Sequence, residues 1–304
     1  MGARVLTLYY HRVQIVEKDY NLLCVSPIRF KQQMLYLKNY YPIVRFEDDW
    51  TELDTDAVAI TFDDGYLDNL QYAQPILEEL EIPATIFVST GTMDQSAELW
   101  WDELERLIFV GKNVPSVFHL IDEEFGCIWD TSTWEYKKNC YGGLHYLMKN
   151  FINPEKREKW LRQMWDWRGL EREVRSENRT VSAEDCRRLV ESKMISIGAH
   201  TISHPSLANL EPERQEYEIK KSIDTLSEVL KRQITLFSYP FGSPEADFND
   251  GTIEICRKYG IQKAASTEHK LWNPAVNPYR IPRKVVRDWT LNEFEQKIKE
   301  YWIE

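Results

Sequence analysis

The sequence has few of the features that mark disulfide-rich secreted proteins or membrane proteins. Its five cysteines are an odd number, widely spread and without a Cys-x-x-Cys pair, which argues against both a disulfide framework and a cysteine zinc site. No apolar run approaches the about 18 residues of a membrane span. The N-terminal residues show no apolar signal-peptide core, so we expect a cytoplasmic protein with reduced thiols.

Positive charge is also scarce. The 38 lysines and arginines are outnumbered by 49 aspartates and glutamates, which gives a formal net charge of −11. This balance argues against a nucleic-acid binder and against a basic membrane-surface protein. Hydrophobic residues, at 43%, and charged residues, at 29%, are close to globular averages, so we expect a folded chain with a large core.

Short apolar runs rich in β-branched and aromatic residues alternate with helical patterns. This alternation predicts a parallel sheet or a βα barrel, and periodicity alone does not separate the two. The predicted strands are Val5–Tyr10, Val58–Phe62, Thr85–Ser89, Ile195–Ala199, Ile234–Tyr239 and Ile281–Val286. The predicted helices run from Pro27 through Leu37, over Tyr66–Leu80, from a capping box at Ser182 to Leu189, and from Pro212 to Leu230.

The stretch from Gln95 to Thr180 breaks the alternation. It has no clear strand run and is rich in tryptophan. Such side chains can stack on sugar rings or a carrier lipid, but at helical spacing they more often form a core. We therefore predict a mainly helical, Trp-rich insertion at 95–180 within one domain that spans 1–304. The seven tryptophans are Trp100, Trp101, Trp129, Trp134, Trp160, Trp165 and Trp167.

Two adjacent carboxylates, Asp63 and Asp64, follow the predicted strand Val58–Phe62 and precede a glycine. Adjacent residues at a strand end can point different ways, so one carboxylate can bind a metal while the other faces a substrate. In βα proteins sites form at this edge of the sheet. An Asp-Asp-Gly sequence by itself is more often a solvated turn.

Two histidines, His200 and His204, follow another predicted strand, Ile195–Ala199. The proline after His204 favours extended geometry, which places the pair on a βα loop. Together with one of the tandem aspartates, the pair provides two imidazoles and one carboxylate. Such a set leaves coordination positions open, which suits catalytic Zn²⁺ or another first-row divalent ion.

These residues resemble the motifs of a known family. Thr-Phe-Asp-Asp-Gly at 61–65 and His-Thr-Ile-Ser-His-Pro at 200–205 are similar to the first two motifs of the polysaccharide deacetylases, the NodB-homology or carbohydrate esterase family 4 proteins. Pro-Ala-Thr-Ile-Phe-Val-Ser at 83–89 adds to the resemblance, and Phe-Ser-Tyr-Pro-Phe-Gly at 237–242 is similar to the third motif. The resemblance implies a distorted (β/α)7 barrel and metal-dependent N-deacetylation of an amino sugar.

Carried over by position, the resemblance implies that Asp64, His200 and His204 hold the metal while Asp63 is the general base. Zn²⁺ is the first expectation, with Co²⁺, Ni²⁺, Mn²⁺ or Fe²⁺ as alternatives. A carboxylate base fits the chemistry, since an amide resists attack by water that is not activated. The backbone N–H of Tyr239, in the third motif, is the implied second donor to the developing oxyanion.

The sequence departs from the usual family order in two places. No histidine follows His269, so the C-terminal histidine acid is missing, whereas His11 closes the first predicted strand. This arrangement resembles the circularly permuted branch, with His11 as an acid whose pKa lies in the neutral range. The third motif also lacks its arginine, and Arg280 or Arg283 can replace it; we predict Arg283. His119 and His145 lack a strand-end context and are predicted to be structural.

We therefore predict a metal-dependent hydrolase that removes an acetyl or other small acyl group from the nitrogen of an amino sugar. The expected substrate is a nucleotide-linked or lipid-linked precursor in bacterial surface polysaccharide or O-antigen biosynthesis, with peripheral contact to a lipid carrier and no nucleic-acid partner. One alternative is a non-haem Fe(II) oxygenase, which shares the ligand set but needs no preceding aspartate. The other is a catalytically silent, carbohydrate-binding protein with the same fold, which the absent C-terminal histidine favours.

Overall fold

The computed structural model describes residues 2–122 and 126–303. The chain separates into two compact units. Unit 1 comprises Met1–Asp94 and Thr180–Glu304, and unit 2 comprises Gln95–Arg179. Among the described helices, none combines the length and the apolar composition that crossing a membrane requires.

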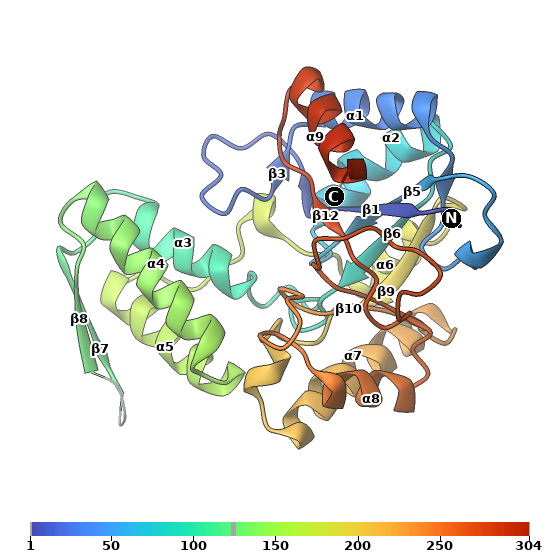
Figure 1. The fold of residues 1–304 in the computed structure, drawn as a ribbon. Helices are drawn as coiled ribbons and strands as arrows, with labels where there is room; N and C mark the ends of the chain where they lie inside the picture. Colours follow the sequence, from blue (N-terminus) through green and yellow to red (C-terminus); the bar gives the residue numbers. More distant parts are fainter. Residues whose placement is uncertain (1, 123–125, 304) are drawn as a thin grey trace. The chain divides into compact units, whose positions relative to one another are not determined.

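Unit 1 is built on a curled, parallel sheet with helices around it (Figure 1). Its strand order is β11-β10-β9-β6-β5-β1-β12, and β4 pairs with β5 beside this path. This sheet with its helices forms a distorted (β/α)7 barrel, as predicted. The strands are β1 (Val5–Tyr10), β4 (Ile43–Val44), β5 (Ala57–Phe62), β6 (Ala84–Val88), β9 (Ile195–Ala199), β10 (Leu236–Ser238), β11 (Lys263–Ala265) and β12 (Lys284–Val285).

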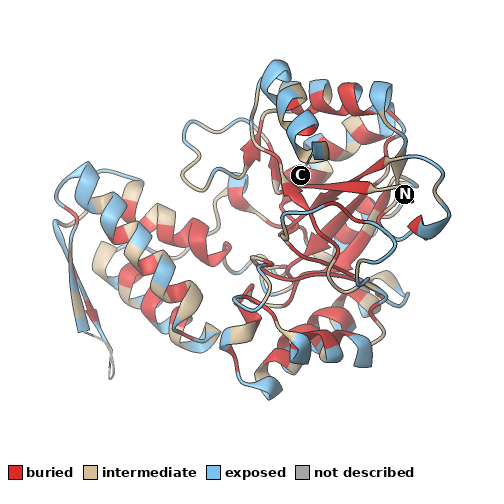
Figure 2. Cartoon of the chain, in the orientation of Figure 1, coloured by how far each residue is buried: buried red, intermediate tan, exposed pale blue. Residues whose placement is uncertain are grey.

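The central strands are buried on both faces. Every residue of β5 and β6 is buried, and β1 has one intermediate position (Figure 2). Continuous apolar strands are typical of parallel sheets that helices cover on the outside. The helices of unit 1 are α1 (Pro27–Tyr40), α2 (Gln74–Glu79), α6 (Ala183–Leu189), α7 (Pro212–Leu230), α8 (Asp250–Lys258) and α9 (Leu291–Ile303), with short 3₁₀ turns η1 (Trp50–Glu52) and η4 (Leu207–Asn209).

Most predicted elements of unit 1 are confirmed. β1 and β9 have the predicted bounds, α1 and α7 begin at the predicted prolines, and Ser182 forms a capping box with Asp185. The predicted helix over Tyr66–Leu80 is confirmed as a continuous helical segment from 67 to 79, in which a π-helical turn, η2 (Asn69–Ala73), leads directly into α2. Pro75 stands at the start of α2 and has no N–H to continue an α-helical ladder backwards.

The part of unit 2 that the structure describes contains three α-helices and an antiparallel hairpin. Its helices are α3 (Trp100–Phe109), α4 (Trp134–Asn150) and α5 (Pro154–Arg168), with a 3₁₀ turn η3 (Ser176–Asn178). The hairpin pairs β7 (Val117–Ile121) with β8 (Gly126–Asp130), so the expectation that this stretch lacks strands is wrong. Exposure alternates along β7, but the exposed positions of the two strands include apolar residues, so the sequence lacks the apolar-polar alternation that marks a half-buried strand.

The tryptophans of unit 2 contribute mainly to its own core. Trp100, Trp101, Trp160 and Trp165 are at most 5% exposed, as a core role predicts, whereas Trp134 is 48% exposed. Ion pairs between partly buried arginines and buried carboxylates hold the end of this unit in place. Arg172 pairs with Glu103, and Arg175 with Glu98, which joins the returning segment to α3.

Candidate metal centre

Most of the predicted site residues follow strand ends on one edge of the sheet in unit 1, whereas Arg283 directly precedes β12. Asp63 and Asp64 directly follow β5, and His200 directly follows β9, on the other side of β6. His11 directly follows β1. Because these strands are parallel, their carboxyl ends meet at one edge, where sites form in α/β proteins.

Asp64, His200 and His204 form a compact, buried set of metal-ligand groups. One ligand atom from each lies within 4.8 Å of the others. The Nε2 atoms of His200 and His204 lie 3.6 and 3.4 Å from the same carboxylate oxygen, Oδ1 of Asp64. Two ligands of a tetrahedral Zn²⁺ at about 2.0–2.1 Å are separated by about 3.3–3.4 Å. The spacing of this donor set therefore fits a first-row divalent cation.

The environment of His200 also fits a metal ligand. Its Nδ1 lies 2.7 Å from the carbonyl oxygen of Ser238, which requires the proton on Nδ1 and leaves the lone pair on Nε2, toward Asp64. A ligating histidine commonly donates its other ring N–H in this way. Burial lowers the pKa of His200, although the Asp63 carboxylate and the hydrogen bond to Ser238 oppose that shift. A neutral imidazole is the form that binds a metal.

The backbone of the proposed ligands and of the loop between them adopts strained conformations. Asp64, Thr201 and His204 adopt left-handed conformations, with φ of 73°, 64° and 53°. Each such residue costs on the order of 1–3 kcal/mol and persists only where its surroundings impose it. Gly65 also has a positive φ of 74°, and a Cβ there would lie 3.1–3.2 Å from Val88. This sharp turn after β5 gives the tandem aspartates different partners.

Asp63 does not point to the histidine pair but to Arg283. The two Nη atoms of Arg283 donate to both carboxylate oxygens of Asp63, at 2.8 and 2.7 Å, and both side chains are buried. Burial alone would raise the pKa of Asp63, but the positive charge and hydrogen bonds of Arg283, aided by His200, lower it to about 2. Asp63 is therefore ionised and oriented beside the metal-ligand set.

Arg283 precedes β12 and is itself held from several sides. Its guanidinium also donates to the hydroxyls of Thr61 and Ser238 and to the carbonyl of Ser266, at 3.2, 2.9 and 3.2 Å. Ser238 thus touches both Arg283 and His200, through its hydroxyl and its carbonyl. Sequence patterns did not single out this residue, since a serine inside an apolar strand carries no local signal.

His11 lies next to Asp63 because β1 and β5 are in register. Tyr10 pairs with Phe62, and the amide of Asp63 donates to the carbonyl of Tyr10 at 3.0 Å. Burial lowers the pKa of His11 to about 3, although the Asp63 carboxylate opposes this. Burial thus moves this pKa away from the neutral range that is expected of an acid. His11 is neutral near pH 7 and can donate only a proton that it first receives.

The segment around His11 is fixed by a buried polar cluster that sequence patterns did not reveal. Asp68 accepts hydrogen bonds from Arg12 Nε and from the amide of Val13, at 2.9 and 3.0 Å. Asn69, the first residue of η2, donates from its side chain to the carbonyl of His11 at 2.8 Å. π-Helical turns are frequent at functional sites. No local pattern links these residues, which are brought together by the pairing of β1 with β5.

The backbone N–H of Tyr239 is the predicted second donor to the oxyanion. It donates to the carbonyl of Ala265 at 3.1 Å, within the pairing of β10 with β11. The Tyr239 ring is buried and stacks on Phe248, with 3.9 Å between ring centroids. This amide is bonded within the sheet, so its role as an oxyanion donor stays a prediction that requires the bond to Ala265 to open or to be shared.

The histidines not yet discussed are not members of the Asp64, His200 and His204 donor set. His145 belongs to unit 2 and packs against Trp100 with ring centroids 4.8 Å apart. Burial lowers its pKa to about 4. His119 is exposed on β7, and His269 is exposed after β11. The predicted structural role of His119 and His145 is not tested by these positions.

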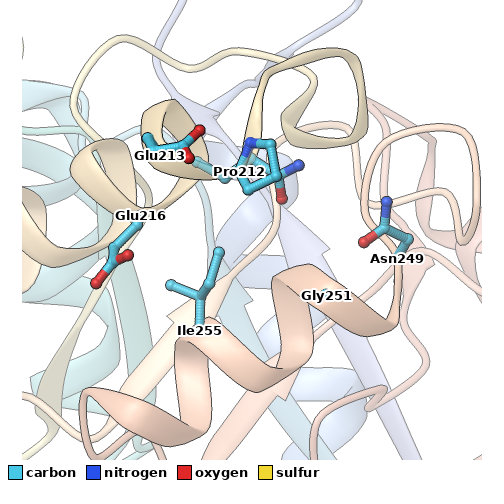
Figure 3. Close-up of a pocket in the computed structure, with 7 residues that line it drawn as sticks. Pro212, Glu213, Glu216, Asn249, Gly251 and Ile255 are labelled. Atoms are coloured by element: carbon cyan, nitrogen blue, oxygen red, sulfur yellow. The ribbon is translucent and has the colours of Figure 1, made fainter.

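A pocket in unit 1 lies apart from the strand-end residues. It has a volume of about 290 Å³ and is lined by residues of α7 and of the start of α8, including Glu213, Glu216 and Asn249 (Figure 3). In the part of the chain that the structure describes, no predicted site residue lines this pocket. The chemistry is therefore assigned to the edge of the sheet and not to this pocket.

Comparison with known proteins agrees with this geometry. The model of the family "Polysaccharide deacetylase" matches residues 51–120 and 155–264, which is more than half of the chain. The chain belongs to the polysaccharide deacetylase family. The matched residues include Asp63, Asp64, His200 and His204, whereas His11 and Arg283 lie outside them. The roles of the last two therefore rest on the sequence resemblance and on their contacts in the structure, and not on the family-model match.

Curated relatives share modest sequence identity with this chain. The poly-β-1,6-N-acetyl-D-glucosamine N-deacetylase of Staphylococcus aureus is 22% identical over 314 residues, which cover 97% of this chain and 82% of that protein. YxkH of Bacillus subtilis, itself only provisionally described as a polysaccharide deacetylase, is 24% identical over 273 residues. That match covers 88% of this chain and 65% of YxkH, which is less than two thirds of its length.

Solved structures of deacetylases share the fold. The deacetylase PplD of Streptococcus pyogenes, determined in complex with acetate, superposes with a TM-score of 0.62 at 17% identity, covering 97% of this chain and 98% of PplD. IcaB of Ammonifex degensii superposes with a TM-score of 0.60 at 19% identity, covering 99% of this chain and 97% of IcaB.

Proposed function

We propose that this chain is a metal-dependent N-deacetylase that hydrolyses the acetamido group, or another small N-acyl group, of an amino sugar in a glycan. The observation that carries the proposal is that a set of metal-ligand groups and a separate carboxylate lie together at one edge of the sheet. One is the donor set of Asp64, His200 and His204, and the other is the carboxylate of Asp63 beside it. Family membership and the name of the S. aureus relative support the same reaction class.

The donor set is suited to a divalent cation, for which we propose Zn²⁺, with Co²⁺, Ni²⁺, Mn²⁺ or Fe²⁺ as alternatives. When bound, such an ion supplies Lewis acidity that polarises a carbonyl oxygen and lowers the pKa of water. Asp64, His200 and His204 are the proposed ligands. The proton of His200 stays on Nδ1, toward Ser238, so its Nε2 remains available.

Asp63 is the proposed general base. Its ionised carboxylate accepts the proton of the attacking water, and its paired hydrogen bonds with Arg283 fix the orientation of the oxygens. Arg283 is thus a positioning residue. His11, which is neutral at rest, is proposed to receive the proton that Asp63 took from water and to deliver it to the nitrogen of the leaving amine, which returns both groups to their starting states.

We also propose a substrate, a pathway and a cellular compartment. The proposed substrate is a nucleotide- or lipid-linked precursor of a bacterial surface polysaccharide or O-antigen, with peripheral contact between the protein and a lipid carrier. The proposed compartment is the cytoplasm. We also keep one deacetylase domain, 1–304, that carries 95–180 as an insertion. Unit 1 includes residues on both sides of unit 2 in the sequence, which supports this division.

The test is a comparison of substrates with the metal-loaded protein. N-Acetylated oligosaccharides, N-acetylated nucleotide sugars and lipid-linked saccharides are each incubated with the protein, and the released acid and the mass of the sugar are followed. Release of acetate by wild type but not by Asp64→Asn supports the proposal. Binding of a glycan without hydrolysis, in a protein that holds its metal, would favour the catalytically silent alternative. Turnover that requires oxygen and 2-oxoglutarate would favour an oxygenase.

A further inference from the structure

Glu218, in α7, is a buried carboxylate outside the proposed ligand set. The residue is 0% exposed. A buried charge is costly unless it is paired and hydrogen-bonded, so the partners of Glu218 indicate what it stabilises. It accepts four hydrogen bonds, and three of them come from the loop that joins the two proposed histidine ligands, residues 200–204, which we call the ligand loop.

The contacts divide between the two oxygens of Glu218. Oε2 accepts from the backbone amides of Ile202 and Ser203, at 3.0 and 2.9 Å. Oε1 accepts from the hydroxyl of Ser203 at 2.8 Å and from Nη2 of Arg214 at 3.2 Å. Two successive amides that converge on one carboxylate oxygen make charge-assisted hydrogen bonds, which are stronger than neutral ones.

The ligand loop needs such an anchor because its backbone is strained on both sides of these amides. Thr201 and His204 adopt the left-handed conformation without being glycine, with φ of 64° and 53°. The local bond from the amide of His204 to the Thr201 hydroxyl, at 3.1 Å, lies within the loop and does not join it to the rest of unit 1. Glu218 joins the loop to α7, a helix that packs on β9. On its other side, the amides of Thr90 and Gly91 donate to carbonyls of the loop and join it to the segment after β6.

We propose that Glu218 is a positioning residue of the metal centre: by anchoring the middle of the ligand loop, it holds both imidazoles in the arrangement that binds a divalent cation. The inference rests on the proposed function, because it requires that Asp64, His200 and His204 bind a metal. It adds a residue that does not touch the metal, the substrate or the reacting atoms.

The same helix offers a matched control. Glu216 is two residues earlier and, in Figure 3, lies on the side of α7 that faces α8. It accepts hydrogen bonds from Lys258 Nζ at 2.6 Å and from the hydroxyl of Tyr259, both from α8 and its end. Glu216→Gln therefore makes the same chemical change in the same helix, away from the ligand loop.

The experiment measures metal affinity without substrate. Apo wild type, Glu218→Gln and Glu216→Gln are titrated with Zn²⁺ against a chromophoric chelator, and the visible spectrum of each Co²⁺ form is recorded. Glu218→Gln is expected to bind Zn²⁺ about 10–100-fold more weakly, the usual effect of losing an outer partner of a ligand, and to show altered Co²⁺ bands. The reason is that both oxygens of Glu218 accept hydrogen bonds, whereas glutamine has one acceptor oxygen and would turn its amide N–H toward groups that are themselves donors. Glu216→Gln is expected to match wild type.

Ser203→Ala keeps the test decisive if Glu218→Gln does not fold. It removes one of the bonds to Glu218 and leaves α7 unchanged, and a smaller loss of affinity in the same direction is expected. Wild-type affinity and Co²⁺ spectrum in folded Glu218→Gln, or in Ser203→Ala if that variant alone folds, would overturn the inference. A wild type without metal affinity would overturn this inference and the proposed function together. A protein that binds Zn²⁺ but hydrolyses no N-acyl sugar would refute the function alone.

Discussion

Arg283 donates two parallel hydrogen bonds to Asp63, from a position 220 residues later in the sequence. The pair occupies both oxygens of Asp63 and keeps this carboxylate out of the adjacent ligand set. It thereby gives two consecutive aspartates two different roles, Asp64 toward the histidines and Asp63 toward the arginine.

Replacement of Asp63 separates catalysis from metal binding. Asp63→Asn is expected to lower kcat by about 10²–10⁴-fold, the usual contribution of a general base, because the amide cannot accept the proton of water. Metal content, measured by inductively coupled plasma mass spectrometry, is expected to equal that of wild type. Loss of metal in this variant would mean that the roles of the two aspartates are reversed.

Replacement of Arg283 tests its positioning role. Arg283→Lys keeps a positive charge but loses the fork that matches both oxygens of Asp63. Hydrogen bonds to charged groups contribute about 1.5–3 kcal/mol, so kcat is expected to fall roughly 10–100-fold with bound metal unchanged. Steady-state kinetics on an N-acetylated oligosaccharide would measure the change. Full activity of Arg283→Lys would contradict the positioning role of the guanidinium and show that only a positive charge is needed at this position.

His200 is expected to be indispensable for the metal. His200→Ala removes one of three ligands and should leave the purified protein with little bound metal and no measurable hydrolysis. His269→Ala is the matched control, because this histidine is exposed and does not belong to the donor set. A His200→Ala protein that is metal-replete and active would refute the site.

His11 is expected to remain neutral across the physiological pH range in the apo protein. Its pKa of about 3 lies below the ordinary 6.5, so between these values the unfolded chain binds a proton that the folded chain does not. The free energy of unfolding therefore decreases as pH falls from about 6.5 toward 3. His11→Gln should lose less stability over this window in urea titrations. An imidazole of His11 that titrates near pH 6.5 by NMR would contradict this expectation.

Gly91 is expected to tolerate no side chain, because it packs against the ligand loop. A Cβ at Gly91 would lie 2.6 Å from the carbonyl oxygen of Ile202, which also accepts the Gly91 amide. Gly91→Ala should destabilise the fold by about 1–3 kcal/mol, as overpacking does, and weaken metal binding. Gly142, inside α4, has nothing within 4 Å, so Gly142→Ala should instead add about 0.5–1 kcal/mol. Denaturant unfolding compares both variants with wild type.

Much of the fold of unit 1 could be predicted because its signals are local. An apolar run such as β1 or β9 has to be buried whatever its neighbours are, and Pro27 and Pro212 begin helices because the first turn needs no proline N–H. The hairpin of unit 2 could not be predicted in this way. Its exposed positions include Ile121 and Ile128, so the polar half of the expected alternation is missing.

The partner of Arg283 could be guessed from the sequence, but no local signal established it. Arg280 and Arg283 lie three positions apart, which in an extended segment means opposite faces, and the pattern does not say which face meets the aspartates. The structure directs Arg280 to Glu268 and Arg283 to Asp63. The interactions of Ser238 and Glu218 had no local signal either, because each depends on which strand or helix its element packs against.

By itself, the sequence determined which side chains can do chemistry here and at which strand ends they stand, since motif residues and strand boundaries are properties of short segments. Only the tertiary structure decided their partners. The register of β1 with β5 places His11 beside Asp63. The left-handed turn at Asp64 directs the tandem aspartates to different partners, and the amide of Tyr239 donates to the carbonyl of Ala265. These outcomes depend on pairing between residues far apart in the chain, where no local preference acts.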